Sequence, residues 1–243
     1  MASHLAVLEF HLKEAWRGWP GMALYLGYTL IVYVVLFSLW GSLEAPPWVL
    51  GYLWAAEALY MGVPRFWSQL HQEARMGELA LRLALPYPFV LLRFQRYLAT
   101  ALLQVPWVVA VGGAVIWALG LPASLSLWSL PALTLGLILN FLLELTFALL
   151  TFRSTSPMAL GVLLEMLRLL GGAVVLPLEF WPGSGALLLL QPLAATFYLP
   201  ARVAAGGEPV WLLGTLGWIL VFLGLLARLF PRALAALSER GEV

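Results

Sequence analysis

Four ionisable side chains, Glu57, Glu144, Glu165 and Arg168, lie inside long apolar runs of this sequence. A charge in the middle of a bilayer costs about 2.5–3.5 kcal/mol on insertion scales, so such residues usually face a protein interior or a watery path. Glu165 and Arg168 are three residues apart, share one face of a helix and can pair. Three interpretations stay open: an ion pair that fixes helix packing, the lining of a substrate path, and a proton relay.

A second group of polar side chains lies in residues 65–96, where charges alternate with regularly spaced apolar residues. A solvated linker does not need this apolar content, whereas an amphipathic helix offered to a partner's groove does. Pro86 and Pro88 end any helix here. The alternative is a helix lying flat on lipid. The residues expected to contact the partner are Glu73, Arg75, Gly77, Glu78, Leu79, Arg82 and Pro86.

The elements that must position these residues are membrane helices, because 63% of the 243 residues are hydrophobic and only 10% are charged. A soluble domain carries about 25% charged residues. One crossing needs about 20 apolar residues. The sequence therefore predicts an all-α polytopic membrane protein, with residues 1–243 as a single transmembrane domain. The six expected spans are 21–40, 48–64, 97–119, 128–152, 158–178 and 209–230.

Two further segments are expected to lie at the membrane surfaces. Residues 1–20 predict an interfacial helix, because leucine and tryptophan recur on one face at helical spacing. A soluble helix packed on its own protein is the alternative. Residues 179–208 are apolar but interrupted by prolines, which break helices. Irregular backbone in hydrocarbon must be buried or line a cavity, so we expect short broken helices dipping in from the outer surface.

The placement of positive charge predicts the orientation. Of the 13 lysine and arginine residues, six spans leave only Arg202 outside and Arg168 deep within a span, and Arg228 lies at the inner end of the last span. The others fall in segments on one side, which the positive-inside rule assigns to the cytoplasm. We therefore expect a multi-pass protein of the cell membrane with both termini in the cytoplasm.

Several classes of chemistry find no support in the sequence. The only lysine, Lys13, stands in Leu-Lys-Glu, so these residues contain no P-loop for ATP. Cysteine is absent and no histidine falls in a span, so we expect no metal site, no catalytic residue and no bound cofactor. The formal net charge of +1 gives no reason to expect nucleic acid.

Short motifs add a family resemblance. Gly77-Glu78-Leu79 runs on to Leu85-Pro86, and Pro177 to Pro182 forms a Pro-x4-Pro block. A third block begins at Gln191-Pro192-Leu193, continues through Tyr198 and Pro200, and is followed by Gly206-Gly207. These stretches resemble motifs in the permease subunits of ABC-2-type ABC transporters. Leu85 stands where that family often has arginine, and Leu193 where it usually has phenylalanine.

The resemblance implies a six-helix permease half with a cytoplasmic coupling helix between spans 2 and 3. It implies a second permease subunit, identical or related, and a separate ABC ATPase chain that binds ATP and Mg²⁺. The broken helices would form an outer gate. Its expected residues are Pro177, Glu179, Pro182, Pro192, Tyr198 and Pro200.

These expectations together predict an ATP-driven exporter embedded in membrane lipid. The low charge of the spans favours a hydrophobic or amphiphilic substrate. The main alternative is a secondary transporter driven by an ion gradient, with Glu57, Glu144 and Glu165 as ion sites. A membrane enzyme acting on lipid would need a clustered nucleophile or metal set, which is not visible. A scaffold without transport is the remaining alternative.

Overall fold

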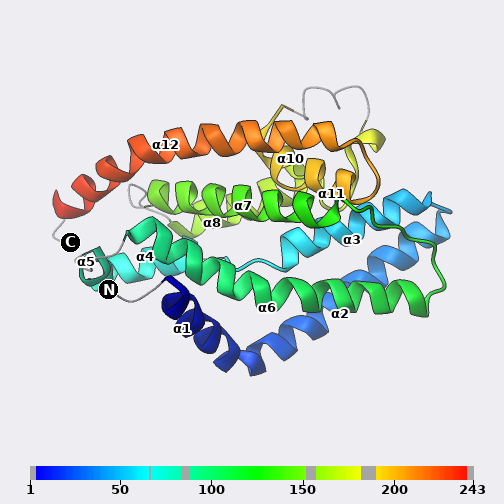
Figure 1. Cartoon of the computed structure of the whole chain (residues 1–243), viewed down its shortest axis with the longest axis horizontal. Coiled ribbons are helices and arrows are strands. Elements are labelled where there is room, and N and C mark those ends of the chain that lie inside the picture. The colour runs from blue at the N-terminus through cyan, green and yellow to red at the C-terminus, as the bar shows by residue number, and fades with distance from the viewer. Residues whose placement is uncertain (1–3, 66, 84–87, 152–156, 182–189, 240–243) are drawn as a thin grey trace.

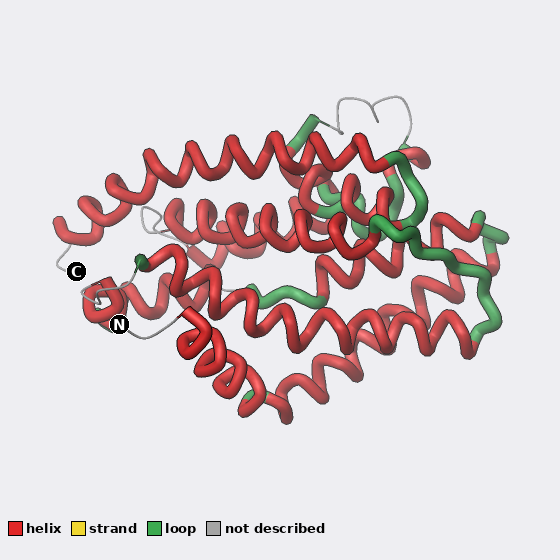
Figure 2. Tube along the Cα trace, viewed as in Figure 1, coloured by secondary structure: helices red, strands yellow, loops and turns green. Residues whose placement is uncertain are grey.

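The long apolar runs fold as helices that lie lengthwise beside one another in the computed structural model (Figure 1). The structure describes residues 4–65, 67–83, 88–151, 157–181 and 190–239. Within those ranges the chain consists of helices and connecting loops, without strands (Figure 2). This confirms the predicted all-α fold.

The first half of the chain holds six helices in the described ranges. They are α1 (His4–Arg17), α2 (Trp19–Ser42), α3 (Pro47–Met61), α4 (Trp67–Arg75), α5 (Glu78–Leu83) and α6 (Phe89–Ala118). The second half contains α7 (Ser129–Thr151), α8 (Pro157–Gly171), η1 (Leu178–Phe180), α10 (Pro192–Thr196), α11 (Tyr198–Ala204), η2 (Pro209–Trp211) and α12 (Leu212–Glu239).

Four segments of the described chain are long and apolar enough to cross a membrane. They are Gly21–Ser42, Phe89–Ala118, Ser129–Leu150 and Pro209–Ala235. The other two expected spans correspond to α3 and α8, each of 15 residues. At 1.5 Å per residue each is about 22 Å long, against about 30 Å of hydrocarbon. The six-span count therefore stays a prediction.

The helix that contains expected span 3 begins before that span. The sequence placed the start of span 3 after Arg96, because charge inside a span is costly, but α6 begins at Phe89 directly after Pro88. Arg93 and Arg96 thus lie on the first turns of α6, and the start of span 3 at residue 97 stays a prediction. The charge of Arg93 is neutralised in the structure, because its guanidinium binds the carboxylate of Glu73.

The helices are arranged so that polar segments gather at one end. Figure 1 shows α4, α5 and the end of α12 together, with α10 and α11 farther along the bundle. The helices α1 and α2 meet at an elbow at Gly18 and both pack against α6. The segment expected to form broken helices contains α10 and α11, of five and seven residues. Hydrogen bonds from Ser126 and Ser129 tie the α6–α7 loop to the end of α11.

Candidate functional site

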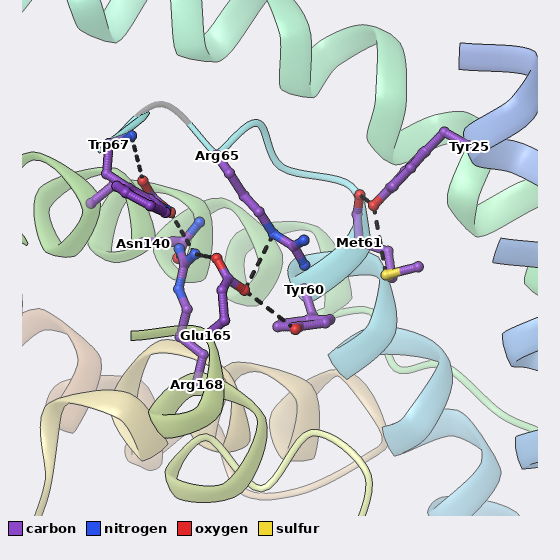
Figure 3. A network of polar contacts seen from close by, with 9 residues as sticks. Tyr25, Tyr60, Met61, Arg65, Trp67, Asn140, Glu165 and Arg168 are labelled. Atoms are coloured by element: carbon purple, nitrogen blue, oxygen red, sulfur yellow. Dashed lines mark hydrogen bonds and ion pairs between the residues drawn. The ribbon is translucent and has the colours of Figure 1, made fainter. Parts of the chain in front are cut away.

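A buried network of charges centres on Arg168 of α8, whose side chain is 1% exposed (Figure 3). Its guanidinium lies 2.5 Å from Glu144 of α7 and 3.2 Å from Glu165 of α8. It also donates a hydrogen bond to the amide oxygen of Asn140. Burying a charge is costly unless it is paired and hydrogen-bonded, and Arg168 meets both conditions.

Helical spacing explains why these groups converge. Asn140 and Glu144 are four residues apart on α7, and Glu165 and Arg168 are three apart on α8. Each pair therefore presents two polar groups from one face of its helix. Tyr97 of α6 accepts a hydrogen bond from the Asn140 amide at 2.9 Å, which adds a third helix. The network thus joins α6, α7 and α8.

The same network reaches the segment that links α3 to α4. Arg65 Nε lies 3.3 Å from Glu165, and the Tyr60 hydroxyl donates to that carboxylate, also at 3.3 Å. The backbone N–H of Trp67, the first residue of α4, donates to Glu144 Oε2 at 3.2 Å. Figure 3 shows Arg65 and Tyr60 on one side of Glu165 and the Arg168 guanidinium on the other. The start of α4 is therefore fixed to α7 and, through Arg65, to α8.

The Trp67 ring adds a packing contact. A Cβ placed on Gly161 of α8 would lie 1.8 Å from that ring, so only glycine leaves room for the indole. Trp67 is 8% exposed and Leu70, one turn later, is fully buried. The first turn of α4 is therefore held by an apolar contact with α8 as well as by polar ones.

Glu73 makes a second attachment farther along α4. Both Nη atoms of Arg93 on α6 bind its carboxylate, and Arg96 Nη1 lies 3.6 Å away. Arg96 also lies 3.4 Å from Glu14, which brings α1 into the cluster. Glu73 is 8% exposed and Arg93 4%. This carboxylate therefore braces α4 against α6 and faces into the chain.

The other expected coupling residues divide between the interior and the surface. Leu79 is buried, whereas Glu78 is exposed. Gly77 has a φ of +72°, which suits glycine and produces the break between α4 and α5. Arg75 and Arg82 lie within α4 and α5, and Pro86 lies outside the described residues.

Of the expected intramembrane residues, the structure brings Glu144, Glu165 and Arg168 together and leaves Glu57 apart. Glu57 is 3% exposed in α3, and its Oε2 has no hydrogen-bond partner among the described residues. Sequence reasoning missed Tyr60, Arg65, Trp67, Arg93 and Asn140 as partners. Only Asn140 carried a signal: an amide in an apolar run, four residues before a buried glutamate.

The expected outer-gate residues lie around the short helices. Arg202 of α11 binds Glu179 of η1 at 2.8 Å, and its guanidinium stacks over Trp48 of α3 at 4.2 Å from the ring centre. Tyr198 is buried and stacks on Trp211. Pro177 precedes η1, Pro192 begins α10 and Pro200 lies in α11, while Pro182 lies outside the described residues.

The apolar helices and the buried charge network define a multi-pass helical membrane protein. The chain matches the family described as ABC-2 family transporter protein over residues 23–241, and it belongs to that family. This confirms the resemblance found in the motifs and makes the chain an ABC transporter permease, a class that associates with an ABC ATPase. None of the curated proteins and none of the solved structures compared with it is a match.

Proposed function

We propose that this chain is the membrane half of an ATP-driven ABC exporter, with α4 and α5 as the lever that receives motion from a separate ATPase. The observation that carries the proposal is the position of Trp67. Its N–H binds Glu144 on α7 and its ring lies against Gly161 on α8, so the start of α4 contacts two membrane helices.

The attachments of α4 suit the transmission of force. The helix has nine residues and is about 13 Å long. It is held at its start by Trp67 and in its middle by Glu73. A packed interface tends to shift between discrete arrangements, because close-packed side chains do not deform continuously. A push on α4 would therefore move α6, α7 and α8 together.

The ATPase would dock on the exposed side of the segment. Gln72, Met76 and Glu78 are exposed there, with Met76 at 71%. The partner chain would bind ATP and Mg²⁺, since these residues contain no P-loop, and this chain would have no enzymatic activity of its own. ATP drives the motion only if the ATPase binds it more tightly in one of two states.

The assembly we propose contains a second permease subunit, identical or related. Apolar side chains are exposed along α2 and α8, among them Leu24, Ile31, Met158 and Met166. Lipid and the second subunit would cover these faces. The protein would cross the cell membrane six times, with α3 and α8 as short crossings and both termini in the cytoplasm.

The substrate we propose is hydrophobic or amphiphilic. Residues 21–42 contain no Asp, Glu, Lys or Arg, so this long span offers no fixed charge to an ionic substrate. The rival mechanism, driven by an ion gradient, has less support. Arg168 already binds Glu144 and Glu165, two of the three carboxylates that an ion relay would use.

The test uses the chain co-expressed with its cognate ABC ATPase in proteoliposomes. Glu78→Arg reverses an exposed charge on the lever, and Glu208→Arg makes the same change at an exposed position before η2. We expect Glu78→Arg to lower the stimulation of ATPase activity by the permease at least several-fold, with membrane insertion intact. Equal stimulation in both variants would contradict docking at α5, and solute transport without the ATPase would contradict the whole proposal.

A further inference from the structure

A two-chambered hollow lies between α1, α2, α6 and the segment from Pro64 to Gln69, and it meets the network around Arg168 only at Arg65 and Tyr97 among the described residues. The first chamber, of about 360 Å³, is lined by polar side chains that include Glu14, Arg65, Gln69 and Arg96. The second, of about 330 Å³, is mostly apolar and is lined by residues such as Gly21, Met22 and Leu103. Ala15, Gly18, Thr100 and Gln104 line both chambers, which are therefore adjacent.

Two guanidiniums of the first chamber are incompletely neutralised. Arg65 is 42% exposed and lies 3.3 Å from Glu165, a carboxylate that also serves Arg168. Arg96 is 31% exposed and lies 3.4 Å from Glu14 and 3.6 Å from Glu73, which is bound more closely by Arg93. Charge-assisted hydrogen bonds are usually about 2.7–2.9 Å long. The contacts of Arg65 and Arg96 are longer than that, and a guanidinium has five N–H donors. Both arginines therefore pair with their carboxylates and keep further donors for an incoming anion.

The chemistry of these donors fits a phosphate group. The planar guanidinium presents paired N–H groups whose spacing matches two oxygens of a phosphate. The Thr100 hydroxyl and the amides of Gln69 and Gln104 add neutral polar groups to the wall. Among the described residues that line this chamber, Glu14 of α1 supplies the one carboxylate.

The order of the chambers along α6 fits an amphiphile. Arg93 and Arg96 line only the polar chamber, Leu103 only the apolar one, and Gln104 both. Along α6 the lining therefore turns from charged at Arg93 to apolar at Leu103 over about 15 Å. On α1, Phe10 and Trp16 are exposed by 64% and 55%, as aromatic side chains are at a headgroup boundary.

The structure assigns this hollow to one molecule of an anionic phospholipid. Its phosphate binds Arg65 and Arg96, and one acyl chain follows Gly21, Met22 and Leu103. Basic pockets between membrane helices on the cytoplasmic side are known to suit anionic headgroups. The site is separate from the docking face of α5 and needs neither ATP nor the ATPase.

The experiment is native mass spectrometry of the delipidated full chain in detergent, titrated with phosphatidylglycerol or phosphatidylcholine. Arg96→Gln removes one phosphate ligand, and Arg232→Gln removes an exposed charge on α12 as the control. We expect Arg96→Gln to weaken phosphatidylglycerol binding by about tenfold, because a charge-assisted hydrogen bond is lost. The control should change by less than about twofold, because exposed charges contribute little.

A second variant fills the hollow and keeps its charges. Thr100→Phe places a ring between the two chambers, and we expect it to abolish the phosphatidylglycerol adduct while all arginines remain. A melting temperature close to that of the parent shows that the variant is folded. Three results would each overturn the assignment. The parent could bind the two lipids equally, Arg232→Gln could lose as much phosphatidylglycerol affinity as Arg96→Gln, or folded Thr100→Phe could bind phosphatidylglycerol as well as the parent. Displacement of the lipid by millimolar inorganic phosphate would assign the site to the free anion instead.

Discussion

Arg168→Met is the sharpest test of the buried network, because it removes one cation that faces two carboxylates and an amide. Arg168 is 1% exposed and Glu144 is completely buried. Methionine fills similar space without charge, so among the described residues the variant leaves Glu144 with only the Trp67 N–H as a hydrogen-bond donor. Glu165 keeps Arg65 and the Tyr60 hydroxyl. The variant therefore leaves one carboxylate, that of Glu144, without its cation.

The magnitude follows from the cost of an unpaired buried charge. Breaking a buried ion pair from one side costs about 3–5 kcal/mol. For a chain of this size each kcal/mol lowers the melting temperature by about 2–4 °C, so we expect a fall of roughly 6–20 °C. Glu144→Gln should cost less, because Arg168 retains Glu165 at 3.2 Å.

The assay is thermal unfolding of the purified chain in one detergent, with both single variants and the double variant. We expect Glu144→Gln combined with Arg168→Met to recover at least half of the loss seen in Arg168→Met, because the stranded carboxylate is gone. The two residues are in contact, so their effects should not add. The reasoning would be refuted if the two single variants lowered the melting temperature equally and the double variant lowered it by the sum of their effects.

Three further predictions concern the lever and the outer helices. Gly161→Ala should displace the Trp67 ring, cost about 1–3 kcal/mol and lower ATPase stimulation, whereas Gly217→Ala, which meets nothing within 4 Å, should not. Glu73→Gln should lower the melting temperature about as much as Arg168→Met, because it leaves buried Arg93 without its carboxylate partner. A negligible change would show that Glu73 does not hold α4 against α6. Arg202→Gln should cost only about 1 kcal/mol by thermal unfolding, since its salt bridge with Glu179 is partly exposed.

Several elements were predictable because they depend on local properties of the chain. The length and apolarity of 21–40, 128–152 and 209–230 are enough to predict membrane helices, and each range coincides largely with a described candidate span. The pair Glu165 and Arg168 follows from helical spacing alone. The motifs around Gly77 and Pro192 led to the correct family.

Only the tertiary structure decided which charged residues pair between different helices. Arg168 meets Glu144 24 positions earlier in the chain, and Glu73 meets Arg93 20 positions later, so no spacing rule connects them. The same long-range pairing allowed α6 to begin at Phe89 although Arg93 follows. Apolar periodicity specifies which residues form helices, because that choice is local. Which buried charges neutralise each other depends on how the helices pack, and packing exists only in the folded chain.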